Sequence, residues 1–335
     1  MTTMLKLLGP IEEDLSELER ELEELVDSNL EPLTDSSSYL LNSGGKRLRP
    51  ALVLLSGKMF DYDFEKARPL AIAVEFVHMA SLVHDDVIDD SDLRRGKEAV
   101  NYKWGNKVAV LSGDLLYTFA ANSLTKLEDS KYLKHLLEAA LGMTRGQASQ
   151  TVYRRKTTLS FMDYLRVIRH KTALLMGKSC LLGAKASGAD EGERARMEKF
   201  GLNLGLAFQI ADDLKDLIGR RDELGKEPGN DLKEGTLTLP TMIALEEGNR
   251  GSFLRKLLRK EDPSEEEIRE GIRIIKSSAA VDRTVDYSRL FADKAIESLP
   301  EGIACESREA LESITRYVSG GEVKGESYLG EAISG

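Results

Sequence analysis

The sequence predicts an all-α protein of ten or more helices. Apolar residues recur at the three- and four-residue spacing of an amphipathic helix along most of the chain, and no segment shows the alternation of a half-buried strand. Aromatic residues make up only 6% of the 335 residues, and there are only 8 prolines. This composition favours helices over a β-sandwich, whose strands are rich in aromatic and β-branched residues.

The first expected element is an amphipathic helix over residues 11–27, which has leucines on one face and glutamates on the others. Packing against its own domain is favoured over a coiled-coil partner. Further helical patterns cover residues 33–43, 46–60, 64–90, 107–127, 131–153, 161–187, 190–219, 237–247, 253–260, 264–277, 279–298 and 301–318. No linker divides residues 1–335, so we expect one domain with a core over residues 33–318 and a mobile Gly-rich tail over residues 319–335.

Composition and charge exclude several classes of protein. The net charge of −10 and the lack of a dense basic tract argue against a nucleic-acid partner. Cys180 and Cys305 lack metal-ligand spacing and are expected to be reduced thiols. No apolar run approaches the roughly 20 residues of a membrane span, and the first residues have no signal-peptide pattern. We therefore expect a cytoplasmic protein.

Two apolar helical segments end in clusters of aspartate. Residues 82–92 read "LVHDDVIDDSD", and residues 205–217 read "GLAFQIADDLKDL". Asp is a poor helix former, and negative charge near a helix C-terminus opposes the helix dipole. Both clusters have the same spacing, with the first and last carboxylates four residues apart on one helical face. Their members are Asp85, Asp86 and Asp89, and Asp212, Asp213 and Asp216.

This repeated spacing predicts a metal site that also binds an anion. One cluster alone could be a solvated helix end, but two identical clusters after apolar runs favour a function. Mg²⁺ in proteins typically takes one or two carboxylates together with substrate phosphate oxygens. The order of ligands in an EF-hand loop is absent.

Basic and polar residues suited to a diphosphate accompany the clusters. "LRRGK" follows the first cluster, and "SGGKRLRP" precedes it without matching a P-loop. Arginine binds phosphate through two parallel hydrogen bonds. Each of these residues alone is more often a surface charge or a satisfied core group. With the two clusters they predict two anionic sites at one metal centre, and the residues are Lys46, Arg47, Arg49, Arg94, Arg95, Lys97, Lys171, Thr172 and Gln209.

With these motifs the sequence resembles the trans-type polyprenyl diphosphate synthases, which include the farnesyl and geranylgeranyl diphosphate synthases. The resemblance covers residues 33–318 and is carried by "GGKRLRP", "EFVHMASLVH", "DDVID", "LRRGK", "LSGDLL", "HKTALL", "FQIA", "DDLKD" and "LGKEPGNDLKEGTLTLP", in the family's order. It implies a single-domain barrel of mostly antiparallel helices around a deep central cavity, usually homodimeric. It also implies the head-to-tail extension of an allylic diphosphate by isopentenyl diphosphate.

The resemblance assigns a role to each matching residue. Lys46, Arg49, His78 and Arg95 would hold isopentenyl diphosphate. Arg94, Lys171 and Lys226 would hold the allylic diphosphate, which could be dimethylallyl, geranyl, farnesyl or geranylgeranyl diphosphate. Three Mg²⁺ ions per active site are implied, bound directly by Asp85, Asp89 and Asp212 and supported by Asp86, Asp213 and Asp216. The catalytic residues Thr172 and Gln209 would offer oxygen dipoles near the allylic cation, beside Lys171.

The sequence departs from the family's common pattern at three places. Thr236 stands where many members have Lys, which affects one diphosphate contact. Glu98–Ala99 replaces a frequent Pro–Thr, and Gln147 replaces a common Glu. None of these changes removes a metal ligand.

Small residues before the first cluster bear on product length. In this family, bulky residues one turn before the first aspartate close the cavity floor, but Ala80 and Ser81 are small here. Phe76 and Val77 could form a deeper floor, and Ala73 is small again. We expect a product longer than geranylgeranyl diphosphate, which is the second choice, and delivery of such a product to a membrane is conceivable.

Four alternatives are weighed against this prediction. A farnesyl or geranylgeranyl diphosphate synthase would differ only in product length. A non-catalytic regulatory subunit of a heteromeric synthase usually loses aspartates from one motif or both, and both motifs are intact here. A terpene cyclase would lack the site formed by Lys46, Arg49 and His78. A helical scaffold without chemistry explains neither cluster.

Overall fold

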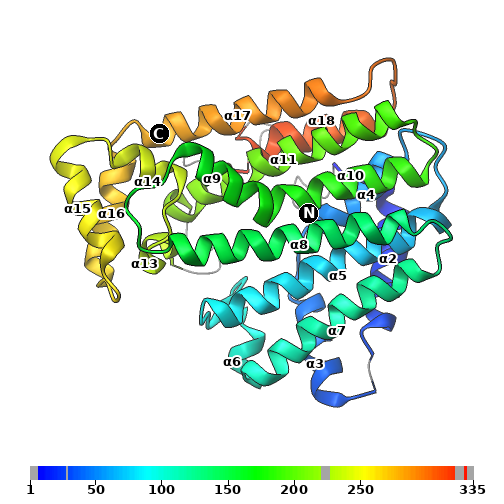
Figure 1. Ribbon diagram of the computed structural model, residues 1–335, viewed down its shortest axis with the longest axis horizontal. Helices are drawn as coiled ribbons and strands as arrows, with labels where there is room; N and C mark the ends of the chain where they lie inside the picture. Colours follow the sequence, from blue (N-terminus) through cyan, green and yellow to red (C-terminus); the bar gives the residue numbers. More distant parts are fainter. Residues whose placement is uncertain (1–6, 28, 220–226, 321–327, 330–335) are drawn as a thin grey trace. The chain divides into compact units, whose positions relative to one another are not determined.

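The computed structural model is helical almost throughout and describes residues 7–27, 29–219, 227–320 and 328–329 (Figure 1). The all-α prediction is confirmed. Within these ranges the strands are confined to one antiparallel hairpin, β1 (Leu93–Arg94) and β2 (Lys97–Glu98). The sequence did not indicate this hairpin because two-residue strands are too short to show alternation.

Contacts between residues group the chain into two compact units, which are described in turn. The first unit comprises Met1–Leu141, Leu175–Gly201 and Ser298–Ile314. The second comprises Gly142–Leu174, Leu202–Glu297 and Thr315–Gly335.

The first unit contains the hairpin and the N-terminal helices. These are η1 (Gly9–Ile11), α2 (Glu12–Leu25), α3 (Glu31–Asn42), α4 (Leu48–Gly57), α5 (Phe64–Ile88), α6 (Val100–Trp104) and α7 (Asn106–Thr125). The unit also includes the beginnings of α8 (Lys131–Tyr153) and α11 (Glu191–Ile218), and most of α10 (Leu174–Ala186) and α18 (Glu306–Val318).

Helix α5 forms the core of the first unit. It packs along α7 and against α4, and it is buried on most of its faces, as its almost continuous apolar sequence requires (Figure 1). The ring of Phe76 lies 5.9 Å from the ring of Phe119 on α7, measured between centroids. The helix begins at Asp63, whose side chain accepts a hydrogen bond from the backbone N–H of Glu65. The predicted helix over residues 64–90 is thus confirmed to within two residues.

Helix α2 packs within its own unit. Its apolar face, which includes Leu15, Leu18 and Leu22, is buried, and it contacts α3, α4 and α5. The expectation that residues 11–27 pack against their own domain is therefore confirmed. Elsewhere in the chain Cys180 and Cys305 are both free thiols, as predicted. Among the described residues, no helix combines the length and the apolar character that crossing a membrane requires.

The second unit contains the remaining helices. These are α9 (Phe161–Ile168), a π-helical turn η2 (Arg169–Ala173), α13 (Asn230–Glu234), α14 (Leu239–Ala244), α15 (Gly248–Arg259), α16 (Glu265–Lys276) and nearly all of α17 (Ala280–Ser298). Helices α15 and α16 lie against each other and contact α13 and α14 (Figure 1). The helix expected over residues 161–187 is thus interrupted by a π-turn. Most of the tail expected to be mobile, residues 319–335, lies outside the described residues, but Tyr328 and Leu329 are described and buried.

The closest approach of α10 to α4 depends on a glycine. A Cβ atom on Gly183 would lie 2.0 Å from the carbonyl oxygen of Val53. We therefore predict that Gly183→Ala lowers the free energy of unfolding by about 2 kcal/mol or more, because two backbones would have to separate. Gly192→Ala is the matched control, since its nearest contact would be the Asp190 side chain at 3.3 Å. Urea unfolding curves that coincide for the two variants would contradict this account of the packing.

Candidate active site

The first aspartate cluster lies at the end of α5, where one of its carboxylates is already bound by the protein. Asp86 is only 1% exposed, and both of its oxygens accept hydrogen bonds from Nε of Arg94 at 2.8 Å. Burial alone would lower the pKa of the Arg94 guanidinium, but the hydrogen bond and the negative charge of Asp86 outweigh it and raise this pKa. Asp85 and Asp89 stay partly exposed to solvent on one face of the helix end. The outer pair, not Asp86, is therefore suited to a metal ion.

The β-hairpin delivers Arg94 to this cluster. Its turn contains Arg95 and Gly96, which both have positive φ, of 53° and 77°. The side-chain amide of Asn101 donates to the carbonyl oxygens of Asp86 at 3.3 Å and Ser91 at 3.0 Å, and so ties the segment after the hairpin to the helix end. The hairpin thus fixes two consecutive arginines in different directions.

The second of these arginines joins a cluster of cations in the first unit. A Cβ atom on Gly45 would lie 2.7 Å from Nη1 of Arg95, so the guanidinium rests against the glycine loop before α4. Burial and the positive charges of Arg49, Arg95 and Arg94 hold the pKa of His78 well below its usual range. His78 is therefore neutral at pH 7 beside several guanidinium groups. Such a concentration of positive charge in a partly buried site favours an anion with several oxygens.

The second aspartate cluster, on α11 in the second unit, is arranged in a related way. Asp213 is buried, and its oxygens accept hydrogen bonds from Nε2 of Gln209 at 2.8 Å and from the hydroxyl of Tyr164 at 2.7 Å. Burial raises the pKa of Asp213 to about 7, with these two hydrogen bonds opposing the rise. Asp216 is also buried, and its Oδ2 accepts from the backbone N–H of Asp231 at 3.1 Å. Asp212 is exposed.

Asp212 has a partner from the last part of the chain. Its Oδ1 accepts a hydrogen bond from the hydroxyl of Tyr328 at 3.0 Å. The Tyr328 ring lies 5.5 Å from the ring of Phe208 and 4.3 Å from Nζ of Lys215, which are on the same helix. Tyr328 thus lies along the face of α11 that carries Asp212.

The π-turn η2 brings Lys171 and Thr172 to the second cluster. A π-turn adds one residue to a helical turn and is frequent at functional sites. Oγ1 of Thr172 donates to Oε1 of Gln209 at 2.6 Å, and Nζ of Lys171 donates to Oε1 of Gln150 at 2.9 Å. A relay of hydrogen bonds therefore runs from Thr172 through Gln209 to Asp213.

Two glycines allow neighbouring helices to approach the π-turn. A Cβ atom on Gly146 of α8 would lie 2.6 Å from the backbone nitrogen of Lys171, and one on Gly205 of α11 would lie 2.4 Å from Cα of Ala173. The turn is therefore held between two helix backbones, which fixes the directions of its side chains.

The structure thus groups the residues singled out in the sequence. Those of the first unit are Lys46, Arg49, His78, Asp85, Asp86, Asp89, Arg94 and Arg95, and those of the second are Lys171, Thr172, Gln209, Asp213, Asp216 and Asp212. Lys226 lies outside the described residues. Sequence reasoning missed Tyr164, Gln150, Tyr328 and Glu75, because each has its partner far along the chain or is an ordinary polar residue in a helix.

The donor set of both clusters fits Mg²⁺. In the first cluster Asp86 is buried against a protein donor and Asp85 and Asp89 are partly exposed, whereas in the second cluster Asp213 and Asp216 are buried against protein donors and Asp212 is exposed. In the described parts of the chain, no three His, Cys, Asp or Glu side chains are grouped closely enough to hold a metal by themselves. Mg²⁺ commonly takes only one or two carboxylates and completes its coordination with water and substrate phosphate. Asp85, Asp89 and Asp212 are the residues whose exposure suits that role.

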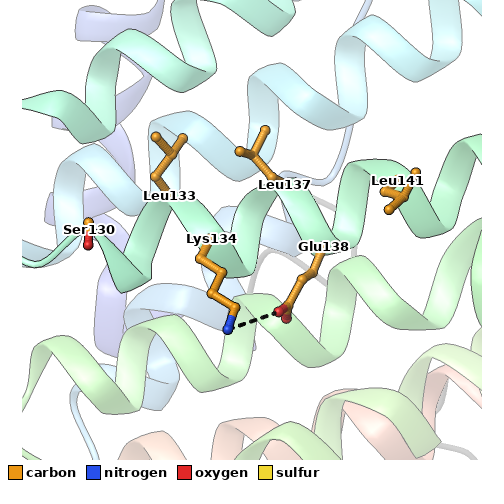
Figure 2. Close-up of a pocket in the computed structure, with 6 residues that line it drawn as sticks. All are labelled: Ser130, Leu133, Lys134, Leu137, Glu138 and Leu141. Carbon is orange, nitrogen blue, oxygen red and sulfur yellow. Dashed lines mark ion pairs between the residues drawn. The ribbon is translucent and has the colours of Figure 1, made fainter.

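A separate apolar surface lies on α8 in the first unit. Figure 2 shows Leu133 and Leu137 projecting from one side of this helix, whereas Lys134 and Glu138 project from the other as an ion pair of 4.0 Å. Leu137 is 54% exposed and Leu141 is 52% exposed. Contiguous exposed leucines mark a contact surface more often than a site of chemistry.

A helical fold with two such aspartate clusters and a cluster of arginines defines an isoprenoid synthase. The sequence matches the polyprenyl synthetase family over residues 30–275. The chain therefore belongs to that family, whose members are prenyltransferases. This confirms the resemblance inferred from the motifs.

Three proteins illustrate the similarity. The chain is 38% identical to heptaprenyl diphosphate synthase component 2 of Bacillus subtilis (strain 168), over 92% of this chain and 88% of that protein. It is 35% identical to nonaprenyl diphosphate synthase of Mycobacterium tuberculosis, over 88% and 90%. The crystal structure of a polyprenyl synthase from Caulobacter crescentus CB15, complexed with calcium and isoprenyl diphosphate, is 34% identical, with a TM-score of 0.91 over 95% and 97%.

Proposed function

We propose that this chain extends an allylic diphosphate with isopentenyl diphosphate, head to tail, into an all-trans polyprenyl diphosphate longer than geranylgeranyl diphosphate. The observation that carries the proposal is the division of labour in each aspartate cluster. In the first cluster Asp86 is buried against protein donors while Asp85 and Asp89 are partly exposed, and in the second Asp213 and Asp216 are buried while Asp212 is exposed. The names of the Bacillus and Mycobacterium relatives support a long product. We also propose that residues 1–335 form one polyprenyl synthase domain, which the family match over residues 30–275 supports.

We assign diphosphate binding to the cations of the sites described above. Lys46, Arg49, His78 and Arg95 hold isopentenyl diphosphate, and neutral His78 does so as a hydrogen-bond donor. Arg94, Lys171 and Lys226 hold the allylic diphosphate. Thr236 supplies a hydroxyl where a further lysine is common in the family, so the allylic site relies more on these three.

The reaction begins with cleavage of the allylic C–O bond. Three Mg²⁺ ions, when bound, would supply Lewis-acid stabilisation of the departing diphosphate. Asp85, Asp89 and Asp212 are the carboxylates proposed to hold these ions, and Asp86, Asp213 and Asp216 support them. The Thr172 hydroxyl donates a hydrogen bond to Gln209, so the lone pairs of the Thr172 oxygen point away from Gln209. Such oxygen dipoles stabilise a developing allylic cation. The double bond of isopentenyl diphosphate then attacks the cation, and a proton leaves to the released diphosphate.

We propose that the enzyme acts as a cytoplasmic homodimer. The exposed leucines of α8 (Figure 2) and the exposed Val110 and Leu111 of α7 provide an apolar surface for a second copy. The Bacillus relative is named as a component, which makes a heteromeric enzyme the alternative. Light scattering of the purified chain, together with a turnover assay of the same sample, distinguishes a homodimer from a heteromer. A monomer that is active only after a second protein is added would contradict the homodimer. A long apolar product would pass to a membrane.

The first prediction concerns the metal ligands. Asp85→Asn or Asp212→Asn should lower turnover by about 10²-fold or more, because each change removes charge that binds Mg²⁺ at the leaving group. Asp90→Asn is the matched control, since Asp90 is exposed in the same stretch and its φ of 47° suits Asn. Turnover is measured at limiting Mg²⁺, with circular dichroism to check the fold. Near-normal rates in either ligand variant would remove this assignment.

The second prediction concerns the paired arginines. Arg94→Lys and Arg95→Lys keep the charge but lose the planar fork that grips two oxygens. We expect a higher KM mainly for the allylic diphosphate in the first variant and mainly for isopentenyl diphosphate in the second. Arg68→Lys, on the same unit but in surface ion pairs with glutamates, should leave both constants unchanged. Unchanged constants for both substrates in both variants would show that the roles are wrong.

The third prediction concerns product length. Ala80 is fully buried one turn before Asp85, and Phe76 and Phe119 are in contact a further turn back. Ala80→Phe should shorten the main product, because a larger side chain raises the floor beneath the growing chain, and the overall rate should change much less. Ala80→Ser serves as the size control. Products are separated by chain length, and an unchanged distribution in Ala80→Phe would mean that other residues set the floor.

A further inference from the structure

Glu75 is a buried carboxylate that the mechanism above does not use. It lies on α5, one turn before His78, and is only 4% exposed. A buried charge is unfavourable unless it is paired and hydrogen-bonded. Its partner is Arg47, whose Nη1 donates to Oε1 of Glu75 at 3.0 Å and whose side chain is 9% exposed. The ion pair with Arg47 therefore compensates the buried charge of Glu75 beneath the cation cluster.

Arg47 has a backbone conformation that residues other than glycine rarely adopt. Its φ of 44° and ψ of 36° are left-handed, and it directly precedes α4. Residues other than glycine keep such a conformation only where surrounding contacts impose it. Gly44 and Gly45, with φ of 84° and 154°, precede it in the same loop. The loop thus has an unfavourable backbone conformation, which contacts with other parts of the protein must stabilise.

The Arg47 side chain is what holds it. In addition to the bond with Glu75, Nη2 donates to the carbonyl oxygen of Leu41 at 2.8 Å, and Nε donates to Oε1 of Glu19 at 3.3 Å. One guanidinium thus joins the loop to α5, α3 and α2. Of its two carboxylate partners, Glu75 is buried, whereas the Glu19 side chain is 49% exposed. The bond to Glu75 is therefore the stronger anchor, because solvent screens the other.

The loop and the first turn of α4 carry residues assigned above to isopentenyl diphosphate. Lys46 precedes Arg47 and Arg49 follows two residues after it, and the guanidinium of Arg95 rests against Gly45. The negative charge of Glu75 also acts on Arg95, opposing the repulsion from Arg94 and Arg47. Glu75 thus both fixes the loop and offsets the mutual repulsion of the cations that surround it.

We propose that Glu75 is a positioning residue for isopentenyl diphosphate, acting through Arg47 to hold the loop of residues 43–47 and the first turn of α4 so that Lys46, Arg49 and Arg95 converge on one diphosphate group. This inference rests on the proposed function, which assigns these three cations to that substrate. Glu75 does not touch the substrate itself. Its role is to keep the binding groups in place before the substrate arrives, which reduces the cost of ordering them on binding.

The experiment compares Glu75→Gln with Glu19→Gln, which removes the exposed carboxylate partner of the same guanidinium. Glu75→Gln should raise KM for isopentenyl diphosphate about tenfold, while kcat and KM for the allylic diphosphate change less than about twofold. Glu19→Gln should behave as the unchanged protein. Arg47→Lys keeps the charge but loses the fork, so it should reproduce the defect. The double variant should be no worse than either single one, because both changes break the same contact.

A direct binding measurement separates positioning from general loss of structure. Calorimetric titration with inorganic diphosphate in the presence of EDTA reports on the cations without metal. Glu75→Gln should weaken this binding by about the same tenfold factor. Tighter binding of diphosphate by Glu75→Gln would mean that Glu75 only repels the anion. A variant in which kcat falls and both KM values rise by similar factors would mean that Glu75 only stabilises the fold. Either result would overturn the proposal.

Arg49→Gln tests the underlying assignment separately. If Arg49→Gln weakens diphosphate binding and Glu75→Gln does not, positioning by Glu75 is wrong and the substrate site stands. If neither variant weakens binding, the assignment of isopentenyl diphosphate to these cations is itself wrong.

Discussion

Negative charge concentrated at the ends of two apolar helices is the constraint on which the rest of this structure depends. Carboxylates near a helix C-terminus oppose its dipole and repel one another. Both clusters meet this cost by burying at least one carboxylate against hydrogen-bond donors of the same unit. Asp86 receives Arg94 from the hairpin, and Asp213 receives Gln209 from its own helix and Tyr164 from α9. The hairpin and the relay are thus explained by what they bring to the aspartates.

The two clusters differ in the kind of donor they use. Asp86 is paired with the full positive charge of Arg94. Further arginines of the first unit lie around His78. Asp213 is matched by neutral donors, and burial raises its pKa instead. The first unit is therefore prepared to receive an anion without help. The second cluster is therefore held by neutral donors among the described residues, whereas the first is held by a charged one.

Most of the helices, and both aspartate motifs, could be predicted because their signals are local. Periodicity located α5 and α8 to within two residues, and the Asp spacing is visible by inspection. The π-turn could not be predicted, since one extra residue in a turn leaves the apolar pattern of residues 161–187 intact. Nor could the pairing of Arg47 with Glu75, 28 residues away, or of Tyr164 with Asp213, 49 residues away. Such partners are set by tertiary packing, and no local spacing encodes them.

The bond between Tyr328 and Asp212 has a consequence for how the protein matures. The two residues are separated by 116 positions in the sequence. A nascent chain that still lacks residue 328 holds all six aspartates but not the donor that orients one of them. During translation, therefore, the second motif acquires this hydrogen bond only after residue 328 has been added, long after the first motif has its Arg94.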